Sequence, residues 1–595
     1  MTMRVKIKFL MVILLLAGVA GLRADPVPID TNALATLAVQ DHGRKKPFTT
    51  FAHEMLLTLS GKAALPVENG EALSPEEVIL DLWLKPEGWD DKPVIMLNFL
   101  ELKKQLGLPE DRKLFSFNEL INKQALLDIL DEAQKLQQAG AGDKLTPLQK
   151  EAEHLGDRLR LFQDLVSGDK ETMVPNPRQM DGRWIPIQEL LVENVRPAER
   201  SAPTGDAAPY YASDSKPAMN AWQTFSGWSD DYKKGDLLSF NSSTPRVVES
   251  LRALALQFYP SAASLQFEHN YMTLEPFLWA WIIYLVALIV LLMTALWMKD
   301  VGYKITWGLV LLGLGFEIWG FVCRIIISGR PPVTDLYETV IWVSFIGMVF
   351  AIILEAVYRK RYFFYAGLPA AILTLIVADS DSTILDASIN PLTAVLRNNM
   401  WLTIHVLTIV SSYAAFALTA ALGHIALVMS LWGKRYSAAQ AEVQFFIYRA
   451  MQIGILLIAT GTILGAVWAN YSWGRYWDWD PKETWALVTL LCYIALLHGR
   501  LAGLWSGFGL AVGSVVCFLS VMMSWYGVNF ILGQNGKSLH SYGLSSGGGG
   551  LATGFAVFEV LFVVFVLWWN AKGLSFGKST VIATSPGSGP STSSG

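Results

Sequence analysis

The sequence predicts a polytopic α-helical membrane protein, with about nine transmembrane helices and an N-terminal, mostly α-helical extracytoplasmic domain. The chain of 595 residues is 52% hydrophobic and 16% charged, whereas an ordinary soluble protein is about 25% charged. Long apolar runs begin after residue 276, and residues 25–275 have the composition of a soluble domain. Five of the 22 tryptophans precede residue 270 and seventeen follow it. These observations exclude a purely soluble enzyme, a fibrous protein and a disordered chain.

The chain begins with a segment that is typical of a secretory signal. Residues 1–24 have a basic start, a short apolar run and small residues before the polar chain, which is how signal peptides are organised. An uncleaved anchor helix is the alternative. Both interpretations place residues 25–275 outside the cytoplasm.

The extracytoplasmic domain, residues 25–275, is expected to be mostly helical. Apolar residues recur at three- and four-residue spacing over 94–106, 117–138 and 145–166, which predicts a helix in each segment. The stretch 174–211 contains several prolines and is expected to be irregular. The sequence of this domain shows neither a metal-ligand cluster nor a nucleophile motif.

The second domain, residues 276–571, contains apolar segments close to the ~20 residues that a bilayer requires. They lie at 277–297, 304–327, 338–358, 363–379, 401–432, 449–470, 484–504, 507–532 and 551–570. With the first domain outside, the loops richer in Lys and Arg fall inside, in agreement with the positive-inside rule. We therefore expect a multi-pass inner-membrane protein with a periplasmic N-terminal domain and a disordered cytoplasmic tail at 572–595.

Charge and cysteine content exclude further classes of function. The net charge is -4 without a basic block, so nucleic-acid binding is not expected. Cys323, Cys492 and Cys517 each lie in an apolar run, and no two are spaced as Cys-x-x-Cys. A disulfide framework, a zinc site and a redox pair are therefore not expected.

The outer loop between the sixth and seventh predicted helices, residues 473–485, is the most informative segment. Its thirteen residues include Trp473, Trp477, Trp479 and Trp485, which exceeds what an interfacial aromatic belt needs. Packed rings at the membrane surface would form a flat platform for a planar macrocycle with acidic edges, and a strong belt is the alternative. If the segment is helical, Trp473 and Trp477 share one face at i, i+4 spacing.

Two pairs of histidines are placed at the two membrane surfaces. His405 follows Trp401 at the outer start of the fifth helix, and His540 lies in the outer loop after the eighth. Imidazole is a common axial ligand of haem iron, so these two could hold a haem from both faces. His498, near the inner end of the seventh helix, and His424, about 30 Å along the helix from His405, could form an inner haem station. Local hydrogen bonding or snorkelling is the alternative for each.

These motifs together resemble the CcsA/ResC family of System II cytochrome c biogenesis proteins. The tryptophan-rich segment is similar to the WWD signature of haem-handling proteins. The resemblance covers about residues 300–570, and four motifs occur in the family's order, at 401–405, 473–485, 497–500 and 539–543. Residues 329–338 are similar to an outer loop of that family, and residues 46–52 more weakly resemble the extracytoplasmic part of CcsB–CcsA-type fusions.

The resemblance implies cytochrome c maturation. Such proteins deliver haem b across the membrane and attach it to the Cys-x-x-Cys-His of apocytochrome c, which is holocytochrome c synthase (haem lyase) activity. His405 and His540 would be the outer axial ligands and catalytic residues, and His498 an inner ligand. The porphyrin would be cradled by Trp473, Trp477, Trp479, Asp480 and Trp485. Asp480 and Glu483 would orient Arg475 or Lys482 or cap the seventh helix, since carboxylates beside the propionates repel them.

The chain departs from the fused family members at two points. Their second inner histidine lies on a transmembrane helix before the outer domain, and residues 1–24 contain no histidine. Either a separate CcsB/ResB-like subunit supplies it, or His424 replaces it. Asp478 stands where a small residue is expected. A haem exporter without ligase activity and a membrane-anchored partner-binding protein are the alternative functions, and paired outer histidines on nine helices disfavour the anchor.

Overall fold

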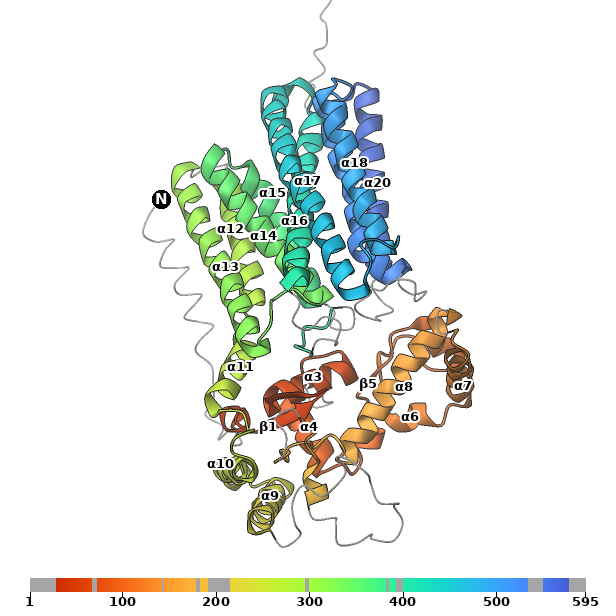
Figure 1. The fold of residues 1–595 in the computed structure, drawn as a ribbon, viewed down its shortest axis with the longest axis vertical. Coiled ribbons are helices and arrows are strands. Elements are labelled where there is room, and N and C mark those ends of the chain that lie inside the picture. Colours follow the sequence, from red (N-terminus) through yellow and green to blue (C-terminus); the bar gives the residue numbers. More distant parts are fainter. Residues whose placement is uncertain are drawn as a thin grey trace, which may run out of the picture.

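A computed structural model describes most of the chain. The described residues are 28–66, 72–141, 144–177, 182–190, 215–294, 299–380, 385–391, 400–532 and 549–576. Within them, a bundle of long helices stands beyond one end of a smaller, mainly helical domain (Figure 1). The signal-like segment 1–24, His540 and residues 577–595 of the tail lie outside the described residues.

The predicted transmembrane helices are confirmed. In the described part of the chain, nine helical spans are long and apolar enough to cross a membrane. Their helices are α12 (Pro276–Thr294), α13 (Lys299–Ser328), α14 (Leu336–Tyr358), α15 (Tyr362–Ser380), α16 (Met400–Ser430), α17 (Ser437–Trp473), α18 (Pro481–Leu501), α19 (Gly507–Met522), continued by the π-helix η7 (Met523–Leu532), and α20 (Gly549–Ala571), with a short 3₁₀ turn, η6 (Gly433–Tyr436). The predicted boundaries of most spans agree with these within a few residues, but α17 begins twelve residues before the predicted start at 449.

The bundle consists of two groups of helices. Helices α12 to α15 pack on one another, α16 to α19 form the second group with α20 against α19, and α14 joins the groups by packing on α16. One continuous apolar core runs through both groups. Apolar side chains such as Ile463 and Leu561 are 66% and 63% exposed on the perimeter of the bundle, where a membrane protein contacts lipid.

The smaller domain, which comprises the described residues before α12 and is called the outer domain after its expected location, has its own apolar core. Its elements are α2 (Thr31–Leu34), β1 (Ala38–Asp41), β2 (Arg44–Pro47), α3 (Phe48–Ser60), β3 (Leu65–Pro66), β4 (Ala72–Leu73), α4 (Pro75–Leu84), η1 (Trp89–Asp91), β5 (Ile95–Met96), α5 (Leu100–Gln105), β6 (Leu114–Phe115), α6 (Phe117–Ile121), α7 (Gln124–Gln138), α8 (Pro147–Val166), η3 (Ile187–Leu190), α9 (Lys216–Lys234), α10 (Leu237–Leu254) and α11 (Ala262–Leu274). The predicted helix over 145–166 is confirmed as α8, and the helix over 117–138 is divided into α6 and α7.

The helix predicted over 94–106 is wrong in its first half. Ile95 and Met96 form strand β5, which pairs antiparallel with Leu114 and Phe115 of β6. The apolar run is fully buried, and periodicity does not distinguish a short buried strand from a helix. Only the second half of the segment is helical, as α5.

One hairpin of the outer domain matters for the site. Strands β1 and β2 are antiparallel and are joined by His42 and Gly43, whose φ angles of 48° and 81° are those of a type I′ turn. Helix α11 packs on β2 and is followed after Glu275 by the first bundle helix, α12. The hairpin is therefore held beside the bundle.

Candidate functional site

A cavity of about 620 Å³ lies between the bundle and the tip of the β1–β2 hairpin. Figure 1 shows the end of the bundle that faces the outer domain. This volume is within the range of small-molecule sites, roughly 300–1,000 Å³. Its walls come from the loop before α14, the start of α16, the last turns of α17, the aromatic segment 473–485, η7 and the tip of the β1–β2 hairpin. Segments far apart in the sequence therefore meet around one space.

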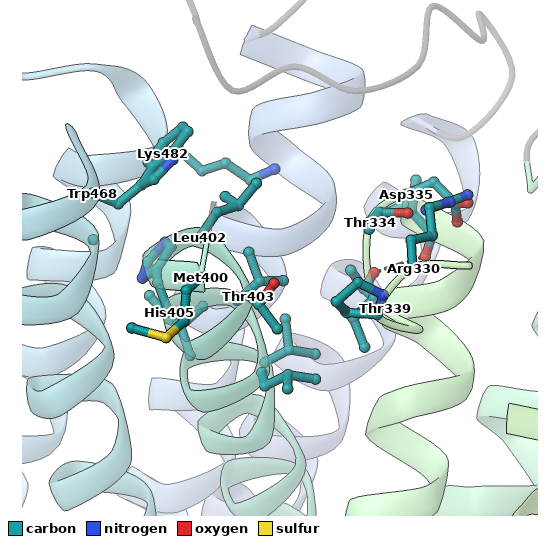
Figure 2. Close-up of a pocket in the computed structure, with 18 of the residues that line it drawn as sticks. Arg330, Thr334, Asp335, Thr339, Met400, Leu402, Thr403, His405, Trp468 and Lys482 are labelled. Atoms are coloured by element: carbon teal, nitrogen blue, oxygen red, sulfur yellow. Dashed lines mark hydrogen bonds between the residues drawn. The ribbon is translucent and has the colours of Figure 1, made fainter. Parts of the chain in front are cut away.

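His405 lies on the wall formed by α16 and α17. Its Nδ1 is 2.7 Å from the carbonyl oxygen of Gly461, and because a carbonyl only accepts, Nδ1 carries the proton and donates. Nε2 then holds the lone pair that a metal ligand needs. The imidazole is stacked on the Trp468 ring, with 8° between the planes, so its orientation is fixed. Figure 2 shows His405 and Trp468 together on one side of the cavity.

Two glycines of α17 allow this close approach. A Cβ on Gly465 would lie 2.6 Å from Cε1 of His405, and one on Gly461 would lie 2.9 Å from Cβ of Ile409. Larger residues would push α16 and the imidazole away. Small residues four apart are a usual device for close packing of membrane helices, and this spacing is the signal by which the pair could have been found in the sequence.

The facing wall is the loop 329–335, which is anchored by a buried polar cluster. Glu338 accepts hydrogen bonds from Arg324 at 2.9 Å and from the backbone and hydroxyl of Thr334 at 2.8 and 2.7 Å. Arg330 lies 3.3 Å from the same carboxylate. Arg324 and Glu338 are each 1% exposed, so the charges satisfy one another. Figure 2 shows Arg330, Thr334 and Asp335 grouped across the cavity from His405.

Among the described residues, the cavity is lined by three cations and two acids, so its ionisable groups favour an anionic ligand: Arg44, Arg330, Lys482, Asp335 and Glu483. Lys482 extends into the cavity in Figure 2 and donates to Oδ1 of Asn529 at 3.3 Å. Asp335 caps α14 by accepting from the Glu338 amide at 2.7 Å. Burial raises the pKa of Asp335, and the nearby Glu338 carboxylate raises it further, so the wall carries less negative charge than its carboxyl groups suggest.

The aromatic segment does not form the expected flat platform. Helix α17 ends at Trp473 because Gly474 adopts the left-handed conformation, so Trp473 and Trp477 do not share a helical face. The ring planes of Trp477 and Trp479 are 87° apart, and Trp473 stands at 69° to Trp468. Of the four predicted tryptophans, only Trp477 lines the cavity. Rings at such angles form a wall around a ligand rather than one surface beneath it.

Asp480 and Glu483 cap α18, as the sequence predicted. The Asp480 side chain accepts from the Lys482 amide at 2.8 Å, and Glu483 accepts from the amides of Asp478 and Asp480 at 2.9 and 3.3 Å. These bonds enclose Trp479, whose φ of 56° is rare for a bulky residue. Trp479, Asp480 and Trp485 are not among the cavity-lining residues. Trp479 is 69% exposed.

The two histidines predicted at the inner end have different surroundings. His498 is exposed near the end of α18, with Nδ1 2.9 Å from the Ile494 carbonyl. His424 is on α16 with both nitrogens engaged: Nδ1 lies 2.8 Å from the Ala420 carbonyl and Nε2 lies 2.9 Å from Glu559 of α20. His424 could bind iron only after its contact with Glu559 opens.

The π-helix η7 supplies residues that sequence reasoning missed. Trp525 and Asn529 both line the cavity, and the Trp525 indole donates to Thr339 at 2.9 Å. π-Helical turns are rare and are frequent at functional sites. A polar asparagine inside an apolar run was the available signal.

Comparison with known proteins found a matching family model and several similar proteins. The family model for "Cytochrome C assembly protein" matches residues 333–534. The cytochrome c biogenesis protein CcsA of Guillardia theta is 34% identical over 246 residues, which is 37% of this chain and 79% of that protein. CcsA of Chlorella vulgaris is 32% identical over 260 residues and 80% of its length. Protein NrfI of Wolinella succinogenes is 28% identical over 537 residues; the match covers 84% of this chain but about half, 53%, of NrfI.

Proposed function

The chain belongs to the CcsA family of cytochrome c biogenesis proteins, and we propose that it presents haem in the outer cavity for attachment to apocytochrome c. The family model spans the cavity walls from the loop before α14 to η7. The proposed substrates are haem b and an apocytochrome with a Cys-x-x-Cys-His motif. The proposed activity is that of a holocytochrome c synthase.

The observation that carries this proposal is the position of His405 in the cavity. Its Nδ1–H is used by the Gly461 carbonyl, which leaves Nε2 suited to bind haem iron. The cavity combines this imidazole with apolar and aromatic walls and with the cations Lys482 and Arg330. A planar, mostly apolar molecule with two carboxylates and a metal centre matches this set of side chains.

The residues of this chain would act mainly by holding the reactants. His405 and His540 are the proposed axial ligands, although His540 lies outside the described residues. With the ring fixed, each substrate thiol adds its S–H across one vinyl double bond, and a thioether forms without loss of any atom. Proximity and orientation are the contribution of the protein, and the electronic chemistry belongs to the porphyrin.

Delivery to the cavity is proposed to begin at the other end of the bundle. His498 is the proposed inner ligand. The contact between His424 and Glu559 disfavours His424 as the second ligand on the other side of the iron. A CcsB/ResB-like subunit is therefore the proposed source of the second inner histidine. Residues 25–275 are proposed to be periplasmic and the bundle to span the inner membrane.

Co-expression with an apocytochrome tests the proposed activity. The wild-type chain, alone or with a CcsB-like partner, should produce cytochrome with covalent haem, measured by haem staining after denaturing electrophoresis. A His405→Ala chain should produce much less. If haem accumulates outside the membrane while no wild-type combination forms covalent cytochrome, the protein is an exporter and the synthase proposal is wrong.

A further inference from the structure

We propose that Arg44, at the tip of the β1–β2 hairpin of the outer domain, binds a propionate of the haem held in the bundle's cavity. This inference rests on the proposed function and extends it, because it gives the outer domain a direct part in haem recognition. The chemistry recognised is a carboxylate on the edge of a planar macrocycle.

The hairpin forms part of the cavity wall. Gly43 and Arg44 line the same space as His405 and Lys482, although more than 350 residues separate them in sequence. The type I′ turn brings the chain to a narrow tip, so Arg44 follows directly after the point that reaches the bundle. These two residues are the outer domain's contribution to the cavity among the residues that the structure describes.

Arg44 is held firmly by neighbouring carboxylates of its own domain. Its Nη1 donates to both oxygens of Glu268 on α11, at 2.8 and 2.9 Å. Its Nη2 is 3.6 Å from Oε1 of Glu54, which is a charge contact but exceeds hydrogen-bond distance. The side chain is 13% exposed. The guanidinium is therefore fixed before any ligand binds.

One edge of this fixed guanidinium makes no hydrogen bond, although Glu54 is in charge contact with its Nη2. Nε and Nη2 of Arg44 are both buried, and neither has a hydrogen-bond partner among the described residues. Together they form the side-on edge of the arginine fork, which matches the two oxygens of a carboxylate. Buried donors without acceptors are costly, and a bound propionate would satisfy both.

The charged groups around Arg44 balance one another. Arg44, Lys46 and Lys170 face Asp41, Glu54 and Glu268 in one connected cluster. His42, beside Arg44, contacts the Asp41 carboxylate at 3.0 Å. The cluster is balanced in formal charge, so it exerts no net attraction on a propionate. Specific hydrogen bonding by Arg44, rather than general attraction, then determines its binding.

The test compares two porphyrins on the full-length chain in detergent. Ferric protoporphyrin IX carries free propionates, and its dimethyl ester carries none. Dissociation constants are measured from the Soret band for the wild type, Arg44→Lys, the double variant R44Q/E268Q and the control Arg112→Gln. Arg112 pairs with Glu119 on the exposed surface of the outer domain, away from the cavity lining.

The wild type and Arg112→Gln should bind the free acid about tenfold or more tightly than the ester, since a charge-assisted hydrogen bond contributes at least that ratio. Arg44→Lys keeps the charge but loses the side-on edge, and R44Q/E268Q removes the ion pair as a unit so that no buried charge is left alone. Both should lower this ratio by about tenfold while the ester's own affinity stays unchanged, and the preference that Lys482 and Arg330 provide should remain. An unchanged ratio in either folded variant overturns the role of Arg44. Failure of the wild type to bind either porphyrin overturns the proposed function itself.

Discussion

At the scale of single residues, the site depends on which nitrogen of His405 carries the proton. The Gly461 carbonyl fixes that choice, and Trp468 fixes the plane of the ring. Both contacts come from α17, so this helix fixes the protonation and orientation of His405 on the neighbouring helix α16. Second contacts of this kind orient metal ligands generally.

Replacing Gly465 by alanine should displace His405. The added Cβ would lie 2.6 Å from Cε1 of the imidazole, so the ring must turn or α16 must move. We expect haem affinity to fall by about tenfold or more, because a 1 Å misplacement can have effects of this size. Titration of haem followed at the Soret band measures it. The control is Gly347→Ala on α14, where an added methyl meets nothing within 4 Å; equal affinities in both variants would show that the contact is unimportant.

Buried Glu171 should make the outer domain sensitive to pH. Burial raises the pKa of Glu171 to about 8, against the lowering effects of Gln188 and Lys233. The neutral carboxyl is therefore favoured in the fold, and its contribution to stability is present below the unfolded pKa and is lost as pH rises through about 8.

Glu171→Gln mimics the neutral form at every pH. At pH 9 the unfolding free energy of the variant should exceed that of the wild type by roughly 1–3 kcal/mol, so the variant should melt at a higher temperature. At pH 4 the two proteins should melt at the same temperature. Thermal unfolding of the full chain at both pH values measures this difference. Glu132→Gln, at an exposed position of α7, should show no such dependence, and an equal shift in both variants would contradict the argument.

At the scale of elements, the start of α18 determines the shape of the aromatic segment. Glu483 holds the amides on both sides of Trp479, and Trp479 keeps a left-handed backbone that costs of order 1–3 kcal/mol elsewhere in proteins. The capping box therefore holds Trp477 at the cavity as well as starting the helix.

Removing this cap should loosen the segment and weaken haem binding together. Glu483→Ala should increase amide hydrogen exchange at Asp478 and Asp480 by an amount equivalent to about 1 kcal/mol, with a lower haem affinity. The matched control is Glu77→Ala, which removes the equivalent capping box of α4 in the outer domain and should leave haem affinity unchanged. If Glu483→Ala loses exchange protection but keeps the haem affinity of the wild type, the cap does not support the haem site.

The elements differ in how far the sequence predicts them. Transmembrane helices follow from the length of apolar runs, because a bilayer sets that length, and the cap of α18 follows from Asp480 and Glu483. Strand β5 was mistaken for helix because its burial hides any alternation. The flat tryptophan platform was mistaken because ring angles depend on the stop at Gly474 and on tertiary packing. Arg44 could not be predicted, since only the fold brings the hairpin to the cavity.

At the scale of the whole molecule, the cavity lies where the two domains meet. The bundle provides His405, and the outer domain provides the hairpin tip. Helix α11 packs on the hairpin and leads into α12, so the outer domain is positioned relative to the cavity at two points. This arrangement requires the cavity and the outer domain to be on the same side of the membrane.

Cysteine labelling tests that arrangement. Ser242→Cys places a thiol at an exposed position of the outer domain, and Ala502→Cys places one in the turn after α18, at the opposite end of the bundle. A membrane-impermeant maleimide should label Ser242→Cys in intact spheroplasts and Ala502→Cys only after lysis. The wild type, with its three native cysteines, gives the background. The reverse pattern would invert the proposed topology.

The most direct test of the account is the absorption spectrum of the purified protein with and without the His405 imidazole. Wild-type protein supplied with haem should show a Soret band of six-coordinate iron. His405→Gly should lose most of that band, and added imidazole should restore it by occupying the space that the side chain leaves. A His405→Gly protein with unchanged haem content and an unchanged spectrum would contradict the assignment of the cavity as the haem site.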